Sequence, residues 1–287
     1  MNLLRNTLYK KYPVIKDQKY IMDYVRPLGI QNNDTIIPEK LLVKDISLFI
    51  NDDILVQTRD LIKFHELYSF LRSSNEVNTK GVINEFIRNG YYPTPDAEVY
   101  AGFIAKYQPE NIFEIGSGFS TIIARKVIDF LNLNTKITII DPQPRTNIDL
   151  YAHCKIFSPV ELTAVENYLG LNSIVFIDSS HIIRAGGDLP FIYNVLIPSL
   201  PKGSIVQVHD IFLPYDYPNI YYKRYYNEQY LLFSLLTNTS RYKILLATHA
   251  LNRYDKSIMQ DALNTKAISD FSAFGASLWF KVETEPI

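Results

Sequence analysis

From residue 111 onward, short apolar runs alternate with helical patterns, and this alternation limits the possible folds more than any other feature. The apolar runs predict strands at residues 111–116, 136–141, 155–158, 173–178, 203–210, 243–248 and 276–282. Helical patterns lie between most of them, at residues 120–133, 161–170, 189–200 and 227–238. Strands that alternate with helices form right-handed βαβ units, so we expect an α/β fold with a mostly parallel sheet. The last two strands lack a clear crossover helix, which favours an antiparallel final strand.

The first 90 residues differ in texture from the rest of the chain. The 287 residues suffice for one or two domains at about 150 residues per domain. Residues 1–90 mix polar and apolar stretches, with a helical pattern at Arg59–Leu71, and a second helical pattern follows at Ala97–Tyr107. We therefore expect a mixed helical N-terminal extension over 1–90, serving acceptor binding or a dimer contact, and an α/β domain over 91–287.

Charge balance and cysteine content argue against several classes of function. The 29 basic and 30 acidic residues leave a net charge of -1, which disfavours nucleic acid or an anionic membrane as partner. The single cysteine, Cys154, excludes an internal disulfide framework and a CxxC metal knuckle. No apolar run approaches the roughly 18 residues of a membrane span, and charges interrupt the N-terminal MNLLRNTLYKKYP before a signal sequence can form. We expect a cytoplasmic protein.

The first strand of the alternating region ends in a glycine turn, EIGSGFST, that is suited to a ligand. Gly116 and Gly118 let the backbone approach a ligand closely, and the helix that follows offers free N–H groups. A dinucleotide fingerprint would have a third glycine where Thr121 stands, and Glu114 would repel a pyrophosphate. Asp141 ends the next strand, where a carboxylate can accept ribose hydroxyls. The alternative without a ligand is a helix-capping turn followed by a turn-forming Asp-Pro.

Several motifs together resemble a known family. FEIGSGFST and ITIIDPQPR, followed by FIDSSH, GSIVQVHDIFLPYDYP and NEQYLL, are similar to the motifs of class I S-adenosylmethionine-dependent methyltransferases. The resemblance covers about Gly90 to Val282 and is strongest to a bacterial branch related to macrocin-type sugar O-methyltransferases. It implies a Rossmann-like fold with seven strands, the last antiparallel, and S-adenosylmethionine as methyl donor. The cofactor-binding residues that it implies are Glu114, Gly116, Ser117, Gly118, Ser120, Asp141, Pro142 and Asp178, with Ser158–Glu161 near the adenine.

A second polar cluster follows the strands at 173–178 and 203–210. Asp178 and His181 follow the first of these strands, and His209 and Asp210 end the second, so all four face one edge of the sheet. In one interpretation Asp178, His209 and Asp210 bind Mg²⁺ or another divalent cation, which would activate an acceptor hydroxyl. The resemblance supports this, although its members tend to have two adjacent oxygen ligands where this chain has His209 before Asp210.

In a second interpretation no metal binds, and His181 or His209 acts as general base, with a partner carboxylate that holds its tautomer. The candidate catalytic residues are therefore His181, His209 and Asp210. A third interpretation gives these residues only structural roles, and that interpretation is preferred for His65, His153 and His249.

The sequence favours O-methylation of a sugar, glycan or secondary-metabolite hydroxyl. The tyrosine-rich segment Pro214–Phe233 suits a small-molecule or glycan acceptor, or else packs on the core or at a homodimer contact. Asn89–Tyr100 could cover the cofactor. The alternatives are a nicotinamide-dependent oxidoreductase, which Glu114 and Thr121 disfavour, and a non-catalytic cofactor-binding protein.

Overall fold

The computed structural model describes residues 40–60, 64–73, 76–78, 81–83, 89–167, 170–258 and 275–286. The chain divides into two compact units, one of Met1–Glu39 with Tyr217–Tyr226 and one of Lys40–Asp216 with Asn227–Ile287. In the smaller unit only Tyr217–Tyr226 is described, and there Tyr217, Tyr221 and Tyr226 pack ring against ring. The expected boundary near residue 90 remains a prediction.

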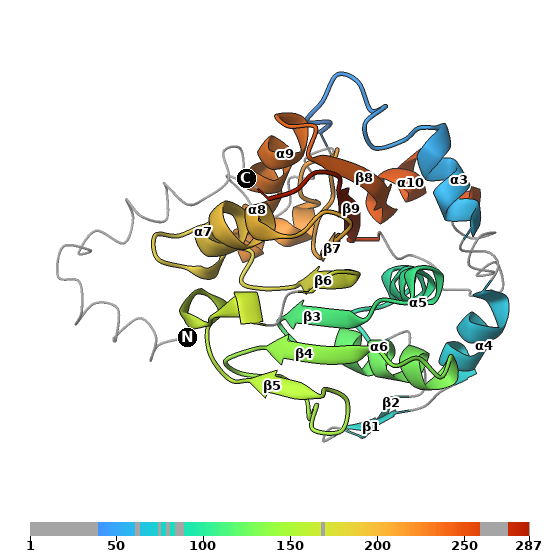
Figure 1. Ribbon diagram of the computed structural model, residues 1–287. Coiled ribbons are helices and arrows are strands. Elements are labelled where there is room, and N and C mark those ends of the chain that lie inside the picture. Colours follow the sequence, from blue (N-terminus) through green and yellow to red (C-terminus); the bar gives the residue numbers. More distant parts are fainter. Residues whose placement is uncertain are drawn as a thin grey trace. The chain divides into compact units, whose positions relative to one another are not determined.

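A seven-stranded sheet forms the centre of the larger unit (Figure 1). Its strand order is β5-β4-β3-β6-β7-β9-β8, and β9 is antiparallel to both neighbours while the other strands run in one direction. The bounds are β3 Asn111–Ile115, β4 Lys136–Ile140, β5 Cys154–Ile156, β6 Ser173–Ile177, β7 Ile205–Val208, β8 Tyr242–Ala247 and β9 Leu278–Val282. This confirms the expected Rossmann-like sheet with an antiparallel last strand. A small hairpin, β1 Glu76–Asn78 and β2 Gly81–Ile83, lies earlier in the chain.

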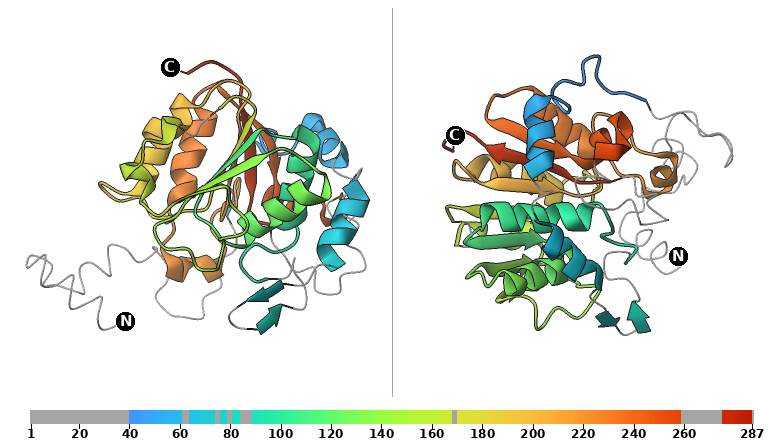
Figure 2. Two further views of the ribbon diagram at one scale, coloured as in Figure 1. Left: turned by 60° about the horizontal axis from the view of Figure 1, so that its bottom comes forward. Right: turned by 90° about the vertical axis from the view of Figure 1, so that its right-hand side faces the viewer.

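Helices cover both faces of the sheet. Figure 2 shows α4, α5 and α6 on one face and α7, α8 and α9 on the other. The bounds are α3 Asp52–Asp60, α4 His65–Ser73, α5 Asp96–Tyr107, α6 Phe119–Phe130, α7 Asp188–Phe191, α8 Ile197–Ser199, α9 Glu228–Thr237 and α10 Thr248–Tyr254. A π-helical stretch, Ile192–Leu196, joins α7 to α8. Among the described residues, no helix combines the length and hydropathy that crossing a membrane requires.

Two of the expected helices differ from the structure. Of the expected helix at 161–170, the structure describes 161–167 and 170. The described part holds two short 3-10 turns, Val160–Leu162 and Val165–Asn167, instead of a helix. Val160 and Val165 are buried while Leu162 is 76% exposed, so the apolar residues of this segment do not share one helical face. In the described part of the pattern at Arg59–Leu71, residues 59–60 end α3 and residues 65–71 form most of α4.

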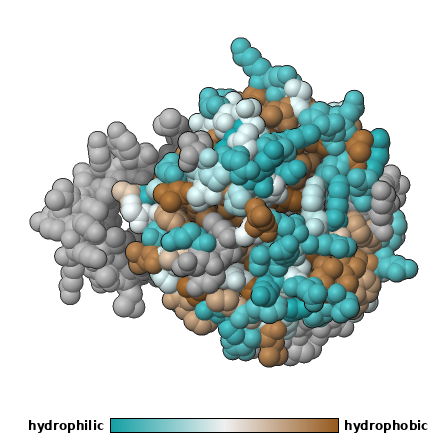
Figure 3. All heavy atoms as spheres, viewed as in Figure 1, coloured by the Kyte–Doolittle hydropathy of each residue, from teal (hydrophilic) through white to brown (hydrophobic). Residues whose placement is uncertain are grey.

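The core explains why the strands read as continuous apolar runs. All residues of β6 and β7 are buried, because helices cover both faces of a parallel sheet. Trp279 of β9 stacks on Phe103 of α5, with ring centroids 4.0 Å apart and an angle of 5° between the planes. On the face seen in Figure 3, hydrophobic residues are interspersed with hydrophilic ones.

The turn after β3 packs directly against the end of β6. Gly116 has φ of +88°, and a Cβ built on it would lie 2.1 Å from the carbonyl oxygen of Asp178. A side chain here would meet the neighbouring backbone before it could meet any ligand. Glycine is therefore required by both backbone conformation and packing.

Gly116→Ala should lower the free energy of unfolding by about 2–5 kcal/mol, combining a left-handed backbone penalty of about 1–2 with an overpacking cost of about 1–3. Urea denaturation measures the change. Gly203→Ala is the matched control, because Gly203 has φ of +93° but no described atom within 4 Å of the place that a Cβ would take. The control should lose only the backbone penalty. Equal losses in the two variants would show that the contact with Asp178 does not require glycine.

Candidate functional site

The residues that follow four parallel strands continue the hydrogen bonding of the sheet. In each case the backbone N–H of the residue after the strand donates to a carbonyl of the neighbouring strand. The bonds are Gly116 to Ile140 at 2.9 Å, Asp141 to Ile156 at 3.1 Å, Asp178 to Ile115 at 2.9 Å and His209 to Ile177 at 2.9 Å. The backbone of each candidate residue is thus fixed at the carboxyl edge of the sheet, where open α/β sheets bind ligands.

The first part of the site is the glycine turn with Asp141. Ser117 Oγ donates to Asp141 Oδ2 at 2.7 Å, and the N–H of Gln143 donates to Asp141 Oδ1 at 2.8 Å. Asp141 is half-buried, and Pro142 beside it is exposed. The structure therefore brings the predicted residues Ser117 and Asp141 together, with the carboxylate already oriented beside the turn.

The buried side chain of Glu114 stabilises the glycine turn. It is completely buried, it accepts from Thr121 Oγ1 at 2.5 Å, and it lies 3.4 Å from the hydroxyl of Tyr100. Thr121 Oγ1 also accepts from the N–H of Gly118 at 3.2 Å. Burial raises the pKa of Glu114 to about 8, despite the opposing hydrogen bonds from Thr121 and Ser120. At neutral pH the carboxyl group is thus mostly protonated, and it tethers α6 to the end of β3.

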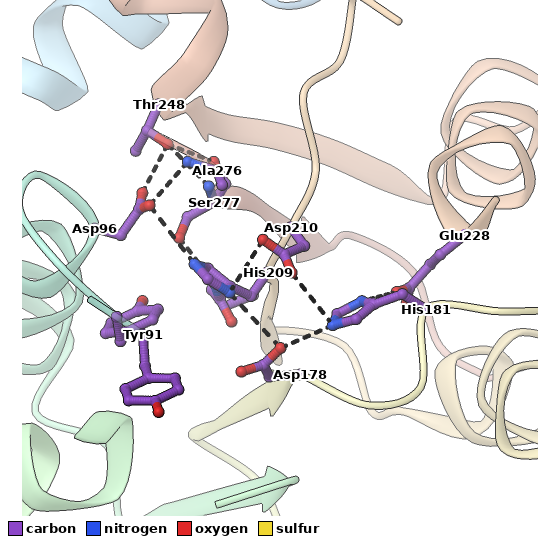
Figure 4. Close-up of polar contacts among 12 residues, drawn as sticks. Tyr91, Asp96, Asp178, His181, His209, Asp210, Glu228, Thr248, Ala276 and Ser277 are labelled. Atoms are coloured by element: carbon purple, nitrogen blue, oxygen red, sulfur yellow. Dashed lines mark hydrogen bonds and ion pairs between the residues drawn. The ribbon is translucent and has the colours of Figure 1, made fainter. Parts of the chain in front are cut away.

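The second part of the site is an alternating row of carboxylates and imidazoles (Figure 4). His209 lies between Asp96 on one side and Asp178 and Asp210 on the other, and His181 lies between those two aspartates and Glu228. The four residues predicted to share one edge of the sheet, Asp178, His181, His209 and Asp210, therefore do meet there. Asp96 and Glu228 complete the row, and neither was predicted from the sequence.

His181 is held firmly in this row. Its Nδ1 lies 2.8 Å from Glu228 Oε2, and its Nε2 lies 3.0 Å from Asp178 Oδ1 and 3.6 Å from Asp210 Oδ2. The other oxygen of Glu228 accepts from the Tyr193 hydroxyl at 2.9 Å. Glu228 is completely buried and His181 nearly so, whereas the Asp178 side chain is 37% exposed. The row is thus accessible from solvent through Asp178.

His209 lies farther from its neighbouring carboxylates than His181 does. Its Nδ1 lies 3.6 Å from Asp178 Oδ1 and 3.9 Å from Asp210 Oδ1, and its Nε2 lies 3.7 Å from Asp96 Oδ2. These are ion-pair distances, and within the described part of the chain the buried Nε2 has no hydrogen-bond partner. The ring of Tyr92 packs beside it, with centroids 4.8 Å apart.

Asp96 connects His209 to the last part of the chain. One of its oxygens accepts from Thr248 Oγ1 at 2.8 Å, and the other accepts from the N–H of Ala276 at 2.8 Å. Asp96 belongs to the first turn of α5, inside the segment Asn89–Tyr100 that was expected to cover a cofactor. The segment thus reaches the site through Asp96, Tyr92 and Tyr91, and Tyr91 stacks on Phe119 at the start of α6.

The row shifts the pKa values of its members strongly. Burial alone would raise the pKa of Asp178, but hydrogen bonds and charge from His181 and His209 outweigh it and hold the pKa far below its usual range. Burial alone would lower the pKa of both histidines. Asp178 and Glu228 instead raise the pKa of His181 well above 6.5, and Asp178 and Asp96 raise that of His209 to about 10. The neighbouring carboxylates thus favour the protonated form of both imidazoles.

Three side chains of the row have the spacing of metal ligands. Single donor atoms of Asp178, His181 and Asp210 lie within 4.8 Å of one another. The sequence predicted His209, and not His181, as the metal ligand beside the two aspartates. His209 also lies close to both aspartates, so its role as a metal ligand stays a prediction. Carboxylate oxygen with imidazole nitrogen is a suitable donor set for a divalent metal.

The remaining candidate residues have supporting positions. Ser120 is buried in the first turn of α6, and Ser158–Glu161 leads into a 3-10 turn beyond β5. His153 Nδ1 accepts from the N–H of Ile137 at 2.9 Å, and His249 is buried with its ring edge-to-face on Phe212, as expected for structural histidines.

Comparison with known proteins gives limited matches. The sequence matches no family model. An uncharacterized protein of Archaeoglobus fulgidus is 46% identical over 57 residues, which are 20% of this chain and 26% of that protein, so the match spans about a quarter of the relative.

Among solved structures, similar chains include two methyltransferases. The SAH-bound methyltransferase PaMTH1 of Podospora anserina is 13% identical with a TM-score of 0.43, over 82% of this chain and 89% of that one. The plantazolicin methyltransferase BpumL in complex with SAH is 13% identical with a TM-score of 0.42, over 84% and 93%. Values this low do not transfer an activity to this chain.

Glu114→Gln should reduce the pH dependence of stability. Because the folded pKa of about 8 exceeds the usual carboxyl value of 4.5, the folded state holds a proton that the unfolded state has lost between these pH values. The stability from this proton is complete below pH 4.5 and is lost as pH rises through about 8. The loss is at most about 1.4 kcal/mol per pH unit.

Urea denaturation from pH 5 to 8 in EDTA tests this. Gln keeps the shape and the hydrogen bond of the protonated acid, so the variant should show a flatter curve than the wild type. Glu161→Gln, in a partly exposed turn, is the control that should leave the curve unchanged. Parallel curves for Glu114→Gln and wild type would contradict a protonated Glu114.

Proposed function

We propose that this protein is an S-adenosylmethionine-dependent methyltransferase that methylates a hydroxyl oxygen of a small molecule or glycan. The proposal rests on two groups that lie together at one edge of the sheet. The first is Asp141, which Ser117 holds in an orientation suited to accept hydrogen bonds from ribose hydroxyls. The second is the anionic row of carboxylates and imidazoles. Asp178 joins the two parts, because its backbone packs on Gly116 and its side chain contacts both histidines.

The edge of the sheet suits the charge and shape of this cofactor. When bound, S-adenosylmethionine supplies an electrophilic methyl group on a positively charged sulfur. Asp141 would accept the ribose hydroxyls, the turn from Gly116 to Gly118 would face the methionine part, and Ser158–Glu161 would lie toward the adenine. A dinucleotide is less suitable, because the row contains two more carboxylates than imidazoles and would repel a pyrophosphate.

The row would remove the proton of the acceptor hydroxyl by one of two routes. In the first, Asp178 and Asp210 with a histidine would hold a divalent cation, whose charge would lower the pKa of the acceptor oxygen. In the second, His181 or His209 accepts the proton directly. The raised pKa values of both histidines favour the cation route, because a protonated imidazole cannot accept a proton.

Binding of S-adenosylhomocysteine tests the cofactor assignment. Asp141→Ala should weaken binding by about 1–3 kcal/mol, or about 5- to 150-fold, because the ribose hydroxyls lose their acceptor. Ser117→Ala should have a smaller effect, since it leaves the carboxylate in place. Titration calorimetry measures both, with the exposed Asp149→Ala as control and NADH as the competing ligand. Unchanged affinity in Asp141→Ala, or tighter binding of NADH, would contradict the assignment.

Transfer of a labelled methyl group tests the reaction. Bacterial metabolite and glycan extracts are incubated with the protein and methyl-labelled S-adenosylmethionine, and mass spectrometry locates the label. We expect label on a hydroxyl oxygen, at least a tenfold loss in Asp210→Asn, and loss in EDTA that is restored by a divalent metal. Label on nitrogen or carbon would refute O-methylation, and full transfer in EDTA would leave the histidine route.

A further inference from the structure

We propose that His181, positioned by Glu228, is the nitrogen ligand of a metal ion that Asp178 and Asp210 also bind, so that the site takes a transition metal such as Zn²⁺, Co²⁺ or Mn²⁺ in preference to Mg²⁺. The inference deepens the proposed function, on which it rests for a divalent cation at this edge of the sheet. It assigns the nitrogen donor to His181 instead of His209, and with it the class of ion.

The donor spacing is that of ligands around one ion. Two ligands about 2.1 Å from a metal lie about 3.0 Å apart at a right angle and about 3.4 Å apart at a tetrahedral angle. The His181 Nε2 atom lies 3.0 Å from Asp178 Oδ1 and 3.6 Å from Asp210 Oδ2. Three side chains from the ends of β6 and β7 can therefore bind the same ion with little movement.

The hydrogen bonding of His181 leaves Nε2 for the ion. Nδ1 lies 2.8 Å from the buried Glu228 carboxylate, which fixes its proton there. The second nitrogen then faces Asp178 Oδ1 at 3.0 Å, a separation at which one metal ion can contact both atoms.

Glu228 has the role that outer carboxylates have in histidine metal sites. A metal-binding histidine usually donates its other N–H to a carboxylate, which orients the ring and increases its basicity. Here Glu228 is itself fixed by Tyr193 and lies 47 residues from His181 in sequence. Charge balance alone would not require a buried carboxylate to lie at hydrogen-bond distance from one particular ring nitrogen.

His209 is less suited to be the nitrogen ligand. Its Nδ1 lies 3.6 Å from Asp178 and 3.9 Å from Asp210, and its Nε2 is directed to Asp96, which is engaged with Thr248 and Ala276. His209 therefore remains beside the ion. Because imidazole binds Zn²⁺, Co²⁺ and Mn²⁺ better than it binds Mg²⁺, the ligand set of His181 with two aspartates selects a transition metal.

The test uses the full-length protein after removal of metals with EDTA. Titration calorimetry with each metal alone should give Zn²⁺ binding about 100-fold or more tighter than Mg²⁺ binding, with Mn²⁺ between them. In the Mn²⁺-loaded protein, pulsed electron paramagnetic resonance should detect the nitrogen of one coordinated imidazole.

Variants identify which histidine is the ligand. His181→Asn should abolish the imidazole signal and the preference for Zn²⁺; Asn tolerates the φ of +59° at this position better than Ala would. His209→Asn, the matched control, should keep both. Glu228→Gln should keep the imidazole signal but weaken Zn²⁺ binding about 10- to 100-fold, and as a near-isosteric change it preserves the fold.

The outcomes separate this inference from the proposed function. Equal affinity for Zn²⁺ and Mg²⁺, no metal binding, or loss of the imidazole signal in His209→Asn but not in His181→Asn would each overturn it. Binding of S-adenosylhomocysteine to each variant is measured in parallel and reports correct folding. If that ligand does not bind to the wild type while Zn²⁺ does, the proposed function fails and the metal site stands.

Discussion

A strand in the middle of a parallel sheet is covered by helices on both faces, so it can expose polar groups only where it ends. This constraint places the chemistry of the protein. β3, β4, β6 and β7 are mostly apolar along their length. Asp141, Asp178 and His209 come directly after β4, β6 and β7, and Asp210 follows His209. Because the strands run in one direction, their polar ends gather along one edge.

The charged side chains at this edge of the sheet need further residues to stabilise them. Carboxylates in a buried position are unfavourable unless they are paired and hydrogen-bonded. The two imidazoles of the row supply the pairing, and Tyr193 and Thr248 supply hydrogen bonds to the outer carboxylates Glu228 and Asp96. Since these contacts come from distant parts of the chain, the site forms only once the whole sheet is assembled.

The sheet and much of the site could be predicted, because the aspartates of the site end apolar runs that are easy to recognise as strands. Asp96 and Glu228 could not, because each lies in the first turn of a helix, where acidic residues are common for their effect on the helix dipole. The sequence could not show that Glu114 is completely buried with a raised pKa, and its role beside a ligand stays a prediction. The helix expected at 161–170 failed for a related reason, since only burial shows which apolar residues share a face.

Asp178 belongs to both parts of the site, and this makes them energetically dependent on each other. Its carbonyl oxygen limits the space at Gly116, and its side chain contacts both imidazoles. A ligand that moved the backbone of Asp178 together with its carboxylate would change the packing against the glycine turn. By thermodynamic reciprocity, a molecule bound at the turn must change affinity at the row by the same factor that the row changes affinity at the turn. Any coupling between the two parts of the site would then pass through one residue.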